Sequence, residues 1–470
     1  MRSSSRSLAF AFAFAFALVA GCVTPGPGPG AGPGPSGWKL PVALSKTFPG
    51  AEPVISTLPD GTLFAEGIGA GPNGNINVIY RSTDDGATWS VVTPPFEGEQ
   101  RSNDGFVATG NGGSVYAANV FSTTFQVFRS DDKGASWTPL AVPHVPVLMH
   151  RHWIVPSGAS TVFVVVEALP PGFASYLAGQ KPPQDVTGTP NEGLWYFMST
   201  DKGTTWSVPA HIDPLVNFAG QGNLVVSPDG KSLYVPRYEE ASKFSPAYKS
   251  GKWYLLSSHD GGSNWKRTEM FALTSELSTA VPALSMDGGG TLYFAWSQQV
   301  GNVSRAMYAF SKDQGVTWST SRAIPGTNGA GRACSGGASA SSPDGCGTNA
   351  MVWAIARGSG ELHAIWYTAD VANGTASQID APWFIDSVNL TGADTDAPTG
   401  AIVRLTLDPV HQGNICARGP ACSGKEDRRL LDYPWMTFGP DGRTHVIFPS
   451  TKWDHPSAFA FYAGEPKKAA

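Results

Sequence analysis

One short pattern, Ser-x-Asp-x-Gly-x-(Thr/Ser/Asn)-Trp, occurs five times in order along this 470-residue chain, at 82–89, 130–137, 199–206, 258–265 and 311–318. The Asp carboxylate can accept hydrogen bonds from backbone N–H groups within a tight turn, and the Gly permits a backbone conformation that a Cβ would penalise. The Ser hydroxyl can tie the two sides of the turn together, while the Trp covers an apolar core. Five copies in order therefore predict a repeated unit of strands joined by tight turns.

This pattern is the Asp box, or BNR repeat, and the chain resembles the sialidase-like β-propeller superfamily over almost everything after residue 37. A second signature, an apolar stretch followed by a tight turn and a β-rich run, occurs seven times. Its copies are 59–65, 111–117, 157–163, 228–234, 287–293, 358–363 and 440–446. We therefore expect an all-β propeller of four-stranded antiparallel blades, with seven blades favoured. Sialidases have six blades, so six with one irregular excursion is the alternative.

The last repeat is one strand short, because the chain ends soon after its third β-rich run. Residues 38–44 resemble the strand that follows an Asp box, so we expect them to supply the missing outer strand and close the ring. A single propeller over residues 38–470 then replaces the count of about three domains that length alone suggests.

The N-terminal 22 residues have the features of a targeting segment. Arg2 and Arg6 precede an apolar run, residues 8–20, that is too short to span a bilayer. The run ends Leu-Val-Ala-Gly-Cys22, which resembles the bacterial lipobox and implies cleavage before Cys22 and a lipid anchor on its thiol. Because Val23 follows, without the Asp typical of inner-membrane retention, we expect an outer-membrane or cell-surface location. An ordinary signal peptide with a chance cysteine is the alternative.

Residues 23–37 are almost entirely Pro and Gly, which predicts a semi-extended spacer between lipid and propeller. The four remaining cysteines allow three disulfide connectivities, and their short spacings favour Cys334–Cys346 and Cys416–Cys422. A metal site built from all four thiolates is the rival interpretation, but the spacings are unlike those of CxxC sites. We expect no metal and no cofactor.

Loop lengths predict which face of the disc carries a site. The turns of the repeats are short, whereas the connections 168–193, 237–252, 326–347 and 391–429 are long and should lie together on the opposite face. Long loops on a rigid scaffold are where binding and catalysis concentrate. From this register we expect a set of polar and aromatic side chains to reach the central well. They are Glu66, Arg101, Asp104, Arg151, His152, Glu167, Arg237, Tyr238, Glu239, Glu276, Trp296, Trp366, Asp370, Arg428, Asp432 and Tyr433.

The resemblance implies a particular chemistry. Sialidases bind the sugar carboxylate with three arginines, use a Tyr assisted by a Glu as nucleophile, and carry an Asp acid/base. The early Arg-Ile-Pro motif of the family is missing here, since no Arg lies between residue 23 and Arg81. Arg151, Arg237 and Arg428 are the candidate replacement cluster.

The candidate nucleophile is Tyr433, or Tyr238 beside Glu239, with Asp104 as the acid. Other Asp-box hydrolases use carboxylate pairs, for which Asp104, Glu167, Glu239 and Asp432 are the candidates. Arg428 is equally well explained as a solvated loop charge.

Four further residues have both a structural and a functional interpretation. Trp296 and Trp366 can stack on sugar rings, although Trp in a propeller is more often core. His150 and His152 share one face of a strand, but no carboxylate is spaced to complete a metal site, so a packed pair is favoured.

Two functions remain open from the sequence. The first is a retaining exo-sialidase-type glycoside hydrolase that acts on extracellular glycans, and the second is a non-catalytic propeller that binds carbohydrate or protein. A formal charge of −5 and a pI near 6.0 give no basis for nucleic-acid binding. We expect a monomer, held to the membrane through its lipid and facing a glycan or glycoprotein ligand.

Overall fold

The computed structural model describes residues 38–467 apart from several gaps. The gaps are 49, 72–73, 97–103, 122–123, 146–147, 170–192, 215–220, 241–250, 274, 276, 280, 328–346, 418–421, 423–424, 454 and 456. The predicted targeting segment, Cys22 and the 23–37 spacer therefore lie outside the described residues. Among the residues that are described, no helix is long and apolar enough to cross a membrane.

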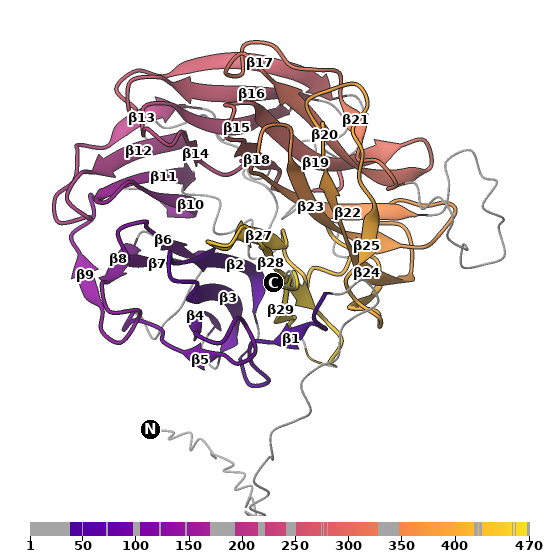
Figure 1. Cartoon of the computed structure of the whole chain (residues 1–470), viewed down its shortest axis with the longest axis horizontal. Coiled ribbons are helices and arrows are strands. Elements are labelled where there is room, and N and C mark those ends of the chain that lie inside the picture. Colours follow the sequence, from indigo (N-terminus) through magenta and orange to yellow (C-terminus); the bar gives the residue numbers. More distant parts are fainter. Residues whose placement is uncertain are drawn as a thin grey trace, which may run out of the picture. The chain divides into compact units, whose positions relative to one another are not determined.

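The described chain forms seven antiparallel sheets that succeed one another around a ring (Figure 1). Blade 1 contains β2 (Ala51–Thr57), β3 (Leu63–Gly71), β4 (Gly74–Ser82) and β5 (Ser90–Val91). Blade 2 contains β6 (Asp104–Thr109), β7 (Val115–Phe121), β8 (Thr124–Ser130) and β9 (Thr138–Leu140). Blade 3 contains β10 (Leu148–Ser157), β11 (Thr161–Leu169), β12 (Gly193–Ser199) and β13 (Ala210–Asp213).

The next two blades have the same order, from inner to outer strand. Blade 4 contains β14 (Val225–Val226), β15 (Leu233–Glu240), β16 (Gly251–Ser258) and β17 (Lys266–Leu273). Blade 5 contains β18 (Ala283–Met286), β19 (Leu292–Val300), β20 (Val303–Ser311) and β21 (Arg322–Ala323).

Blade 6 has a fifth strand, and blade 7 takes its outer strand from the start of the described chain. Blade 6 contains β22 (Thr348–Ala356), β23 (Leu362–Ala369), β24 (Ala381–Leu390), β25 (Ile402–Arg404) and β26 (His411–Gly413), which pairs with β24. Blade 7 contains β27 (Trp435–Phe438), β28 (Thr444–Ser450), β29 (Phe459–Gly464) and β1 (Val42–Ala43).

The ring is closed as the sequence predicts. Strand β1 pairs antiparallel with β29, with Val42 opposite Tyr462 and Ala43 opposite Phe461. Each inner strand also contacts the inner strand of the next blade, from β2 round to β27 and back to β2. The seven-bladed prediction is therefore confirmed and the six-bladed alternative is wrong.

The Asp boxes form the predicted turns. In the first box Asp84 Oδ1 accepts hydrogen bonds from the Ser82 hydroxyl at 2.8 Å and the Thr88 N–H at 2.9 Å. The Ser82 hydroxyl in turn accepts the N–H of Gly86 at 2.9 Å. Gly86 has a φ of 78°, and a Cβ there would lie 1.9 Å from the Tyr462 ring, so the turn requires glycine. These turns hold the ends of the outer two strands of blades 1 to 5.

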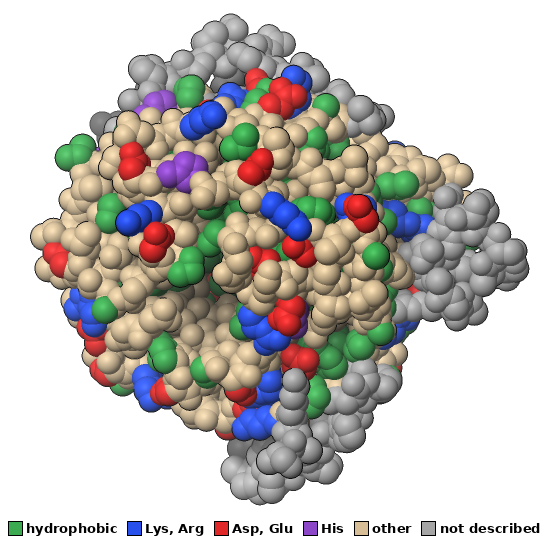
Figure 2. All heavy atoms as spheres, turned by 45° about the horizontal axis from the view of Figure 1, so that its top comes forward, with side chains coloured by type: hydrophobic (Ala, Val, Ile, Leu, Met, Phe, Trp, Pro, Cys, Tyr) green, Lys and Arg blue, Asp and Glu red, His purple; other side chains and the backbone are tan. Residues whose placement is uncertain are grey.

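Charges of both signs are interspersed over the face of the molecule that Figure 2 shows. No single-sign patch stands out on the face in view, which agrees with the absence of a nucleic-acid signature in the sequence.

Candidate functional site

Three inner strands have a β-bulge near their N-terminal ends. The register shifts by one residue where β2 pairs with β3, where β10 pairs with β11 and where β22 pairs with β23. The bulged residues Glu52, Arg151 and Met351 have positive φ angles of 46°, 54° and 53°. Non-glycine residues adopt this conformation at a cost, and bulges of this kind re-aim side chains beside functional sites. The bulges place Glu52 and Arg151 where regular strands would not.

Glu52 and Arg151 meet three other charged residues. We call the five together the Asp432 cluster: Glu52, Asp104, Arg151, Arg428 and Asp432. Asp432 Oδ2 accepts a hydrogen bond from Arg151 Nη2 at 2.6 Å, and Asp432 Oδ1 accepts one from Arg428 Nη1. The Glu52 carboxyl hydrogen-bonds to Asp432 and lies 3.9 Å from Arg151 Nη2. The Asp104 carboxylate accepts the backbone N–H of Arg151 at 2.7 Å. The cluster thus joins blades 1, 2, 3 and 7.

The two acids at the centre of the cluster have opposite pKa shifts. Burial alone would raise the pKa of Asp432, but Arg428 and Arg151 outweigh it and hold this pKa well below its usual range. Burial, then Asp432 and Asp104, raise the pKa of Glu52 well above its usual value, although Arg151 opposes them. Near neutral pH we therefore expect Glu52 to be a protonated donor and Asp432 an anion.

A further acid, Glu66, lies against the cluster in blade 1. It is fully buried, and neither of its carboxyl oxygens has a hydrogen-bond partner among the described residues. Burial, Glu52 and Asp104 together raise its pKa well above the usual value. A Cβ on Gly105 would lie 2.1 Å from Glu66 Oε1, so only glycine at that position leaves room for the acid. Glu66 thus adds a neutral carboxylic acid beside the site.

Aromatic rings pack on the other side of Arg151. The Arg151 guanidinium carbon lies 5.5 Å from the Tyr433 ring centroid, and Tyr433 packs on Trp353 and Trp435 at 5.4 and 5.7 Å. Trp435 also stacks on Trp153 at 5.6 Å, and these two rings line a cavity of about 210 Å³ between the inner strands. Burial and Glu52 raise the pKa of Tyr433 well above its usual value.

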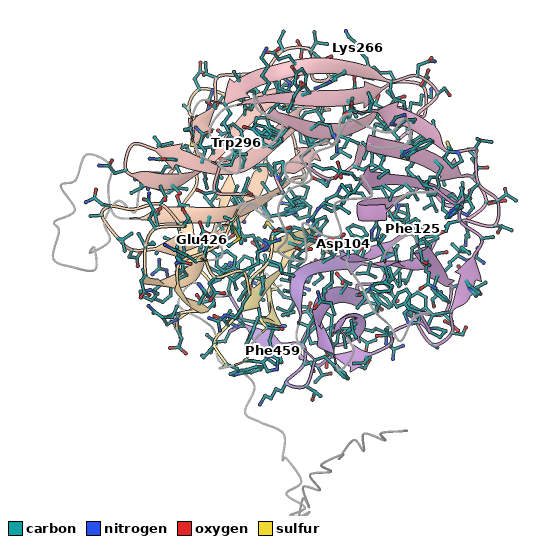
Figure 3. The ribbon with its side chains drawn as sticks, turned by 180° about the vertical axis from the view of Figure 1, so that it is seen from behind. Asp104, Phe125, Lys266, Trp296, Glu426 and Phe459 are labelled. Carbon is teal, nitrogen blue, oxygen red and sulfur yellow. A yellow bond between two sulfur atoms is a disulfide. The ribbon has the colours of Figure 1, made fainter. Side chains whose placement is uncertain are left out.

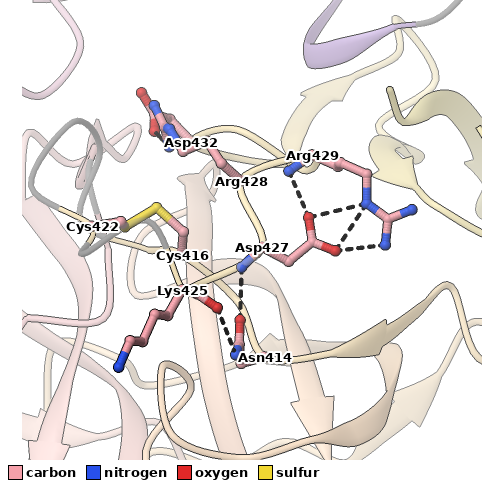
Figure 4. Close-up of a disulfide and its surroundings, with 8 residues drawn as sticks. All are labelled: Asn414, Cys416, Cys422, Lys425, Asp427, Arg428, Arg429 and Asp432. Carbon is pink, nitrogen blue, oxygen red and sulfur yellow. Dashed lines mark hydrogen bonds and ion pairs between the residues drawn. A yellow bond between two sulfur atoms is a disulfide. The ribbon is translucent and has the colours of Figure 1, made fainter. Parts of the chain in front are cut away.

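The loop before β27 delivers Arg428 and Asp432, and a disulfide holds it (Figure 4). Cys416 and Cys422 are bonded, which confirms one predicted pair. The Cys416 N–H donates to the Asp427 carbonyl at 2.9 Å, and Arg429 Nε donates to Asp427 Oδ2 at 2.9 Å. Figure 4 shows Arg428 and Asp432 together, on the side of the loop away from the Asp427–Arg429 pair.

The structure does not bring the third predicted arginine to the cluster. Arg237 is fully buried between blades 3 and 4, where it donates to Glu167 at 2.9 Å and to Asp213 at 3.3 Å. Its neighbour Tyr238 is buried against Trp253 in the same region.

The two predicted carbohydrate-stacking residues are buried instead. Trp296 packs against Phe271 and Phe294 at 5.1 and 5.2 Å, and Trp366 is fully buried. In Figure 3 Asp104 lies near the middle of the ring, whereas Trp296 lies within a blade. Both Trp rings are therefore part of the packed core.

Other expected members lie elsewhere or cannot be placed. Glu239 is partly exposed and pairs with Arg267 at 2.7 Å, and Asp370 pairs with Arg404 at 2.7 Å. His152 packs against the Phe125 ring at 5.0 Å, in keeping with the packed interpretation. Among the described residues no group of acids, His and Cys could hold a metal ion. Arg101, Glu276, Cys334, Cys346 and the His150 side chain lie outside the described parts.

Glu52 is the residue that sequence reasoning missed. It precedes Pro53 at the start of the first inner strand, and simple alternation of buried and exposed positions does not show that a bulge turns it into the cluster. An acid directly before a proline at the start of an inner strand is the signal that was available.

Comparisons with known proteins agree at the level of fold. No protein-family model matches the chain, and no curated protein matches it. Similar solved structures include a protein of unknown function from Dyadobacter fermentans, with 16% identity, a TM-score of 0.45 and coverage of 91% of this chain and 98% of that one. The Hadza microbial sialidase Hz136 has 15% identity, a TM-score of 0.44 and coverage of 86% and 74%.

An α-L-arabinofuranosidase, Arb93A from Fusarium graminearum, is also similar, with 15% identity, a TM-score of 0.43 and coverage of 78% and 98%. Solved sialidase structures are thus among the similar folds, as the predicted resemblance to sialidase-like propellers implies. At these identities and TM-scores the likenesses say nothing about the reaction, and the seven-bladed architecture stands on its own strand order.

Proposed function

We propose that this protein is a glycoside hydrolase, held by a lipid on Cys22 at the outer membrane or cell surface, that acts on extracellular glycans through the Asp432 cluster. The observation that carries the proposal is the buried, hydrogen-bonded pair of Glu52 and Asp432 with pKa values pushed in opposite directions. Acids with separated pKa values at one site are typical of acid/base catalysis. The strained bulge that positions Glu52 adds support, because such strain gathers at functional sites.

The residues have distinct tasks in this proposal. Protonated Glu52 donates its proton to the oxygen of the leaving sugar, and the new carboxylate is then stabilised by Arg151, 3.9 Å away. Asp432, held as an anion, stabilises the positive charge that develops on the sugar ring. Because Glu52 and Asp432 hydrogen-bond to each other, they cannot flank a glycosidic bond from opposite sides. We assign the opposite carboxylate to Asp104 on blade 2, where it would take the proton of the water that attacks the anomeric carbon while the glycosidic bond breaks.

The narrower hypothesis is a retaining exo-sialidase-type enzyme. It is supported by the meeting of Tyr433, Arg151 and Arg428, three of the residues that the resemblance selects. Tyr433 would then be the nucleophile. Arg237 would contribute nothing directly, because it is committed to Glu167 and Asp213.

A non-catalytic binding module is the second candidate. The observation that favours it is the separation of the expected catalytic set: Tyr238 is buried against Trp253, and Glu239 pairs with Arg267 at the surface. Such a module would present its long-loop face to glycan or protein without chemistry.

The deciding experiment measures turnover of a panel of fluorogenic aryl glycosides, including a sialoside, by the full chain in detergent. We expect Glu52→Gln to lower kcat by about 100-fold or more, since general acid catalysis contributes about 10²–10⁴. Glu239→Gln, which changes a partly exposed acid outside the cluster, is the matched control. No turnover of any glycoside by the folded protein would move the assignment to the binding module. Loss of turnover in Tyr433→Phe with retained sialoside binding would support the narrower hypothesis.

The proposed membrane anchor is tested separately. Cys22→Ser should release the protein from the membrane fraction if the lipid anchor is present. Retention of this variant in the membrane fraction would contradict the anchor without touching the proposed reaction.

A further inference from the structure

The Asp432 cluster presents a ligand with carboxylate acceptors as well as guanidinium and carboxylic-acid donors. Glu52, Asp104 and Asp432 contribute carboxyl groups, whereas Arg151 and Arg428 are the two guanidinium groups of the cluster. An ionised carboxylate accepts hydrogen bonds and donates none. A sugar hydroxyl can donate to such a carboxylate, but a carboxylate on the ligand cannot. The balance of donors and acceptors therefore favours hydroxyl groups at this site.

The charges of both arginines are already offset within the cluster. Arg151 Nη2 and Arg428 Nη1 bind the two oxygens of the same acid, Asp432, whose side chain is 5% exposed. A ligand carboxylate could take over these contacts only by leaving Asp432 buried and unpaired, which is strongly unfavourable.

Glu52 shows how these surroundings affect an ionised carboxylate. It lies 3.9 Å from Arg151, yet its anion is disfavoured, because burial and the charges of Asp432 and Asp104 outweigh the arginines. The carboxylate of an acidic sugar placed beside Glu52 would meet the same field.

One buried donor remains open for a neutral acceptor. Arg151 Nη1 has no hydrogen-bond partner among the described residues, although the Arg151 side chain is only 7% exposed. A buried donor without a partner costs free energy, so a ligand oxygen that fills this position is favoured. A hydroxyl or ring oxygen satisfies Arg151 Nη1 without bringing a second negative charge next to Asp432.

We infer that the Asp432 cluster takes an uncharged sugar, a neutral pentose or hexose, in preference to a sialic or uronic acid. The site is the one assigned above to hydrolysis, so the inference rests on the proposed function for its reaction. The binding preference is a property of the well that can be measured without turnover.

The test measures binding of methyl glycosides to the full chain in detergent by calorimetry and saturation-transfer NMR. Neutral pentosides and hexosides are compared with the glycosides of sialic acid and glucuronic acid. We expect the best neutral glycoside to bind at least about 10-fold more tightly than either acid. An acidic glycoside that binds more tightly than every neutral one would overturn the inference. So would the absence of binding by every glycoside at a ligand concentration of about 10 mM, roughly the upper limit of such titrations.

Two variants make the cause visible. Asp432→Asn releases Arg151 and Arg428 from their shared anion, so the preference should shift toward the acidic glycosides by about 10-fold or more. The matched control is Asp213→Asn, the same change at a buried acid that pairs with Arg237 away from the cluster, and its preference should equal that of the wild type. If Asp432→Asn does not fold, Glu52→Gln serves instead, because neutral glycosides should still bind best to it. An unchanged preference in folded Asp432→Asn would contradict the charge argument.

Failure of this inference and failure of the proposed function are distinguishable. Hydrolysis of a sialoside but of no neutral glycoside would retain the enzyme and refute the neutral preference. Tight binding of a neutral glycoside without turnover would retain the preference and refute the enzyme.

Discussion

Burial should make the Asp432–Arg151 ion pair contribute much more to the free energy of unfolding than an exposed ion pair does. Arg151 Nη2 and Asp432 Oδ2 are 2.6 Å apart with side chains 7% and 5% exposed. Lys452 Nζ and Asp408 Oδ2 are 2.7 Å apart, but their side chains are 46% and 70% exposed. The two pairs have nearly the same length and differ in their access to water, so Asp432→Asn and Asp408→Asn form a matched comparison.

The expected magnitudes differ several-fold. Removing one charge of a buried pair costs about 3–5 kcal/mol, because the other charge stays buried without its partner. An exposed pair contributes about 0–1 kcal/mol, since water and salt screen it. For a chain of 470 residues, an unfolding entropy of about 2.1 cal/mol/K per residue makes the larger loss a fall in melting temperature of about 3–5 °C.

The neighbouring acid should soften the loss. Once Asp432 is neutral, Glu52 can ionise beside Arg151 and act as its counter-charge. We therefore expect Asp432→Asn to fall at the lower end of the range, and the double variant with Glu52→Gln to lose more than the sum of the single variants.

Urea unfolding of the wild type, the three single variants and the double variant at pH 7, followed by near-UV circular dichroism, measures these free energies. Equal losses below about 1 kcal/mol for Asp432→Asn and Asp408→Asn would refute the reasoning from burial. Strictly additive losses in the double variant would refute the coupling of Glu52 to Asp432.

Three further predictions concern the acids and the disulfide. Because the folded-state pKa of Glu52 is raised, its contribution to stability is present at acidic pH and is lost as pH rises above its usual value; Glu52→Gln should therefore gain stability relative to wild type between pH 5 and pH 8, and a constant difference would contradict the shift. In the Asp boxes, hydrogen bonds from Ser136 and Thr205 lower the pKa of Asp132 and Asp201 to about 2. Their contribution to stability is present above the usual Asp pKa and is lost as pH falls toward 2. Over that window the wild type should therefore lose stability more steeply than the double variant Asp132→Asn/Asp201→Asn, and equal pH slopes for the two proteins would contradict the prediction. Removing the disulfide with Cys416→Ser/Cys422→Ser should cost about 2 kcal/mol from the small loop it closes and should weaken glycoside binding, because the loop carries Arg428 and Asp432; unchanged binding would show that hydrogen bonds alone hold the loop.

The repeat chemistry made most of the fold predictable. Each Asp box is a local turn whose hydrogen bonds run between residues at most four apart, so the sequence specifies it without distant contacts. The seven repeats and the short final blade then predicted the blade number and the pairing of β1 with β29, both of which are present. The Cys416–Cys422 bond followed from spacing for the same reason of proximity along the chain.

The site was predictable only in part. Asp104, Arg151, Arg428, Asp432 and Tyr433 were expected at the well, and the structure brings them together.

Arg237 and Trp296 were expected there as well, and the structure buries both inside or between blades. Strand alternation gives the side on which a residue lies, but each blade faces neighbours on both sides. Whether an inward side chain meets the well or the next blade therefore depends on the packing of whole sheets.

By itself the sequence determined the closed seven-bladed ring, since turn chemistry and repetition act over a few residues at a time. Only the tertiary structure decided that Glu52 belongs to the site, because a bulge at the start of β2 turns it toward the well. Only the tertiary structure could join Arg151 to Asp432 across 281 positions of the chain. Ring closure is the physical reason: it brings the inner strands of blades 1, 2, 3 and 7 to one point, where their charges set each other's pKa values.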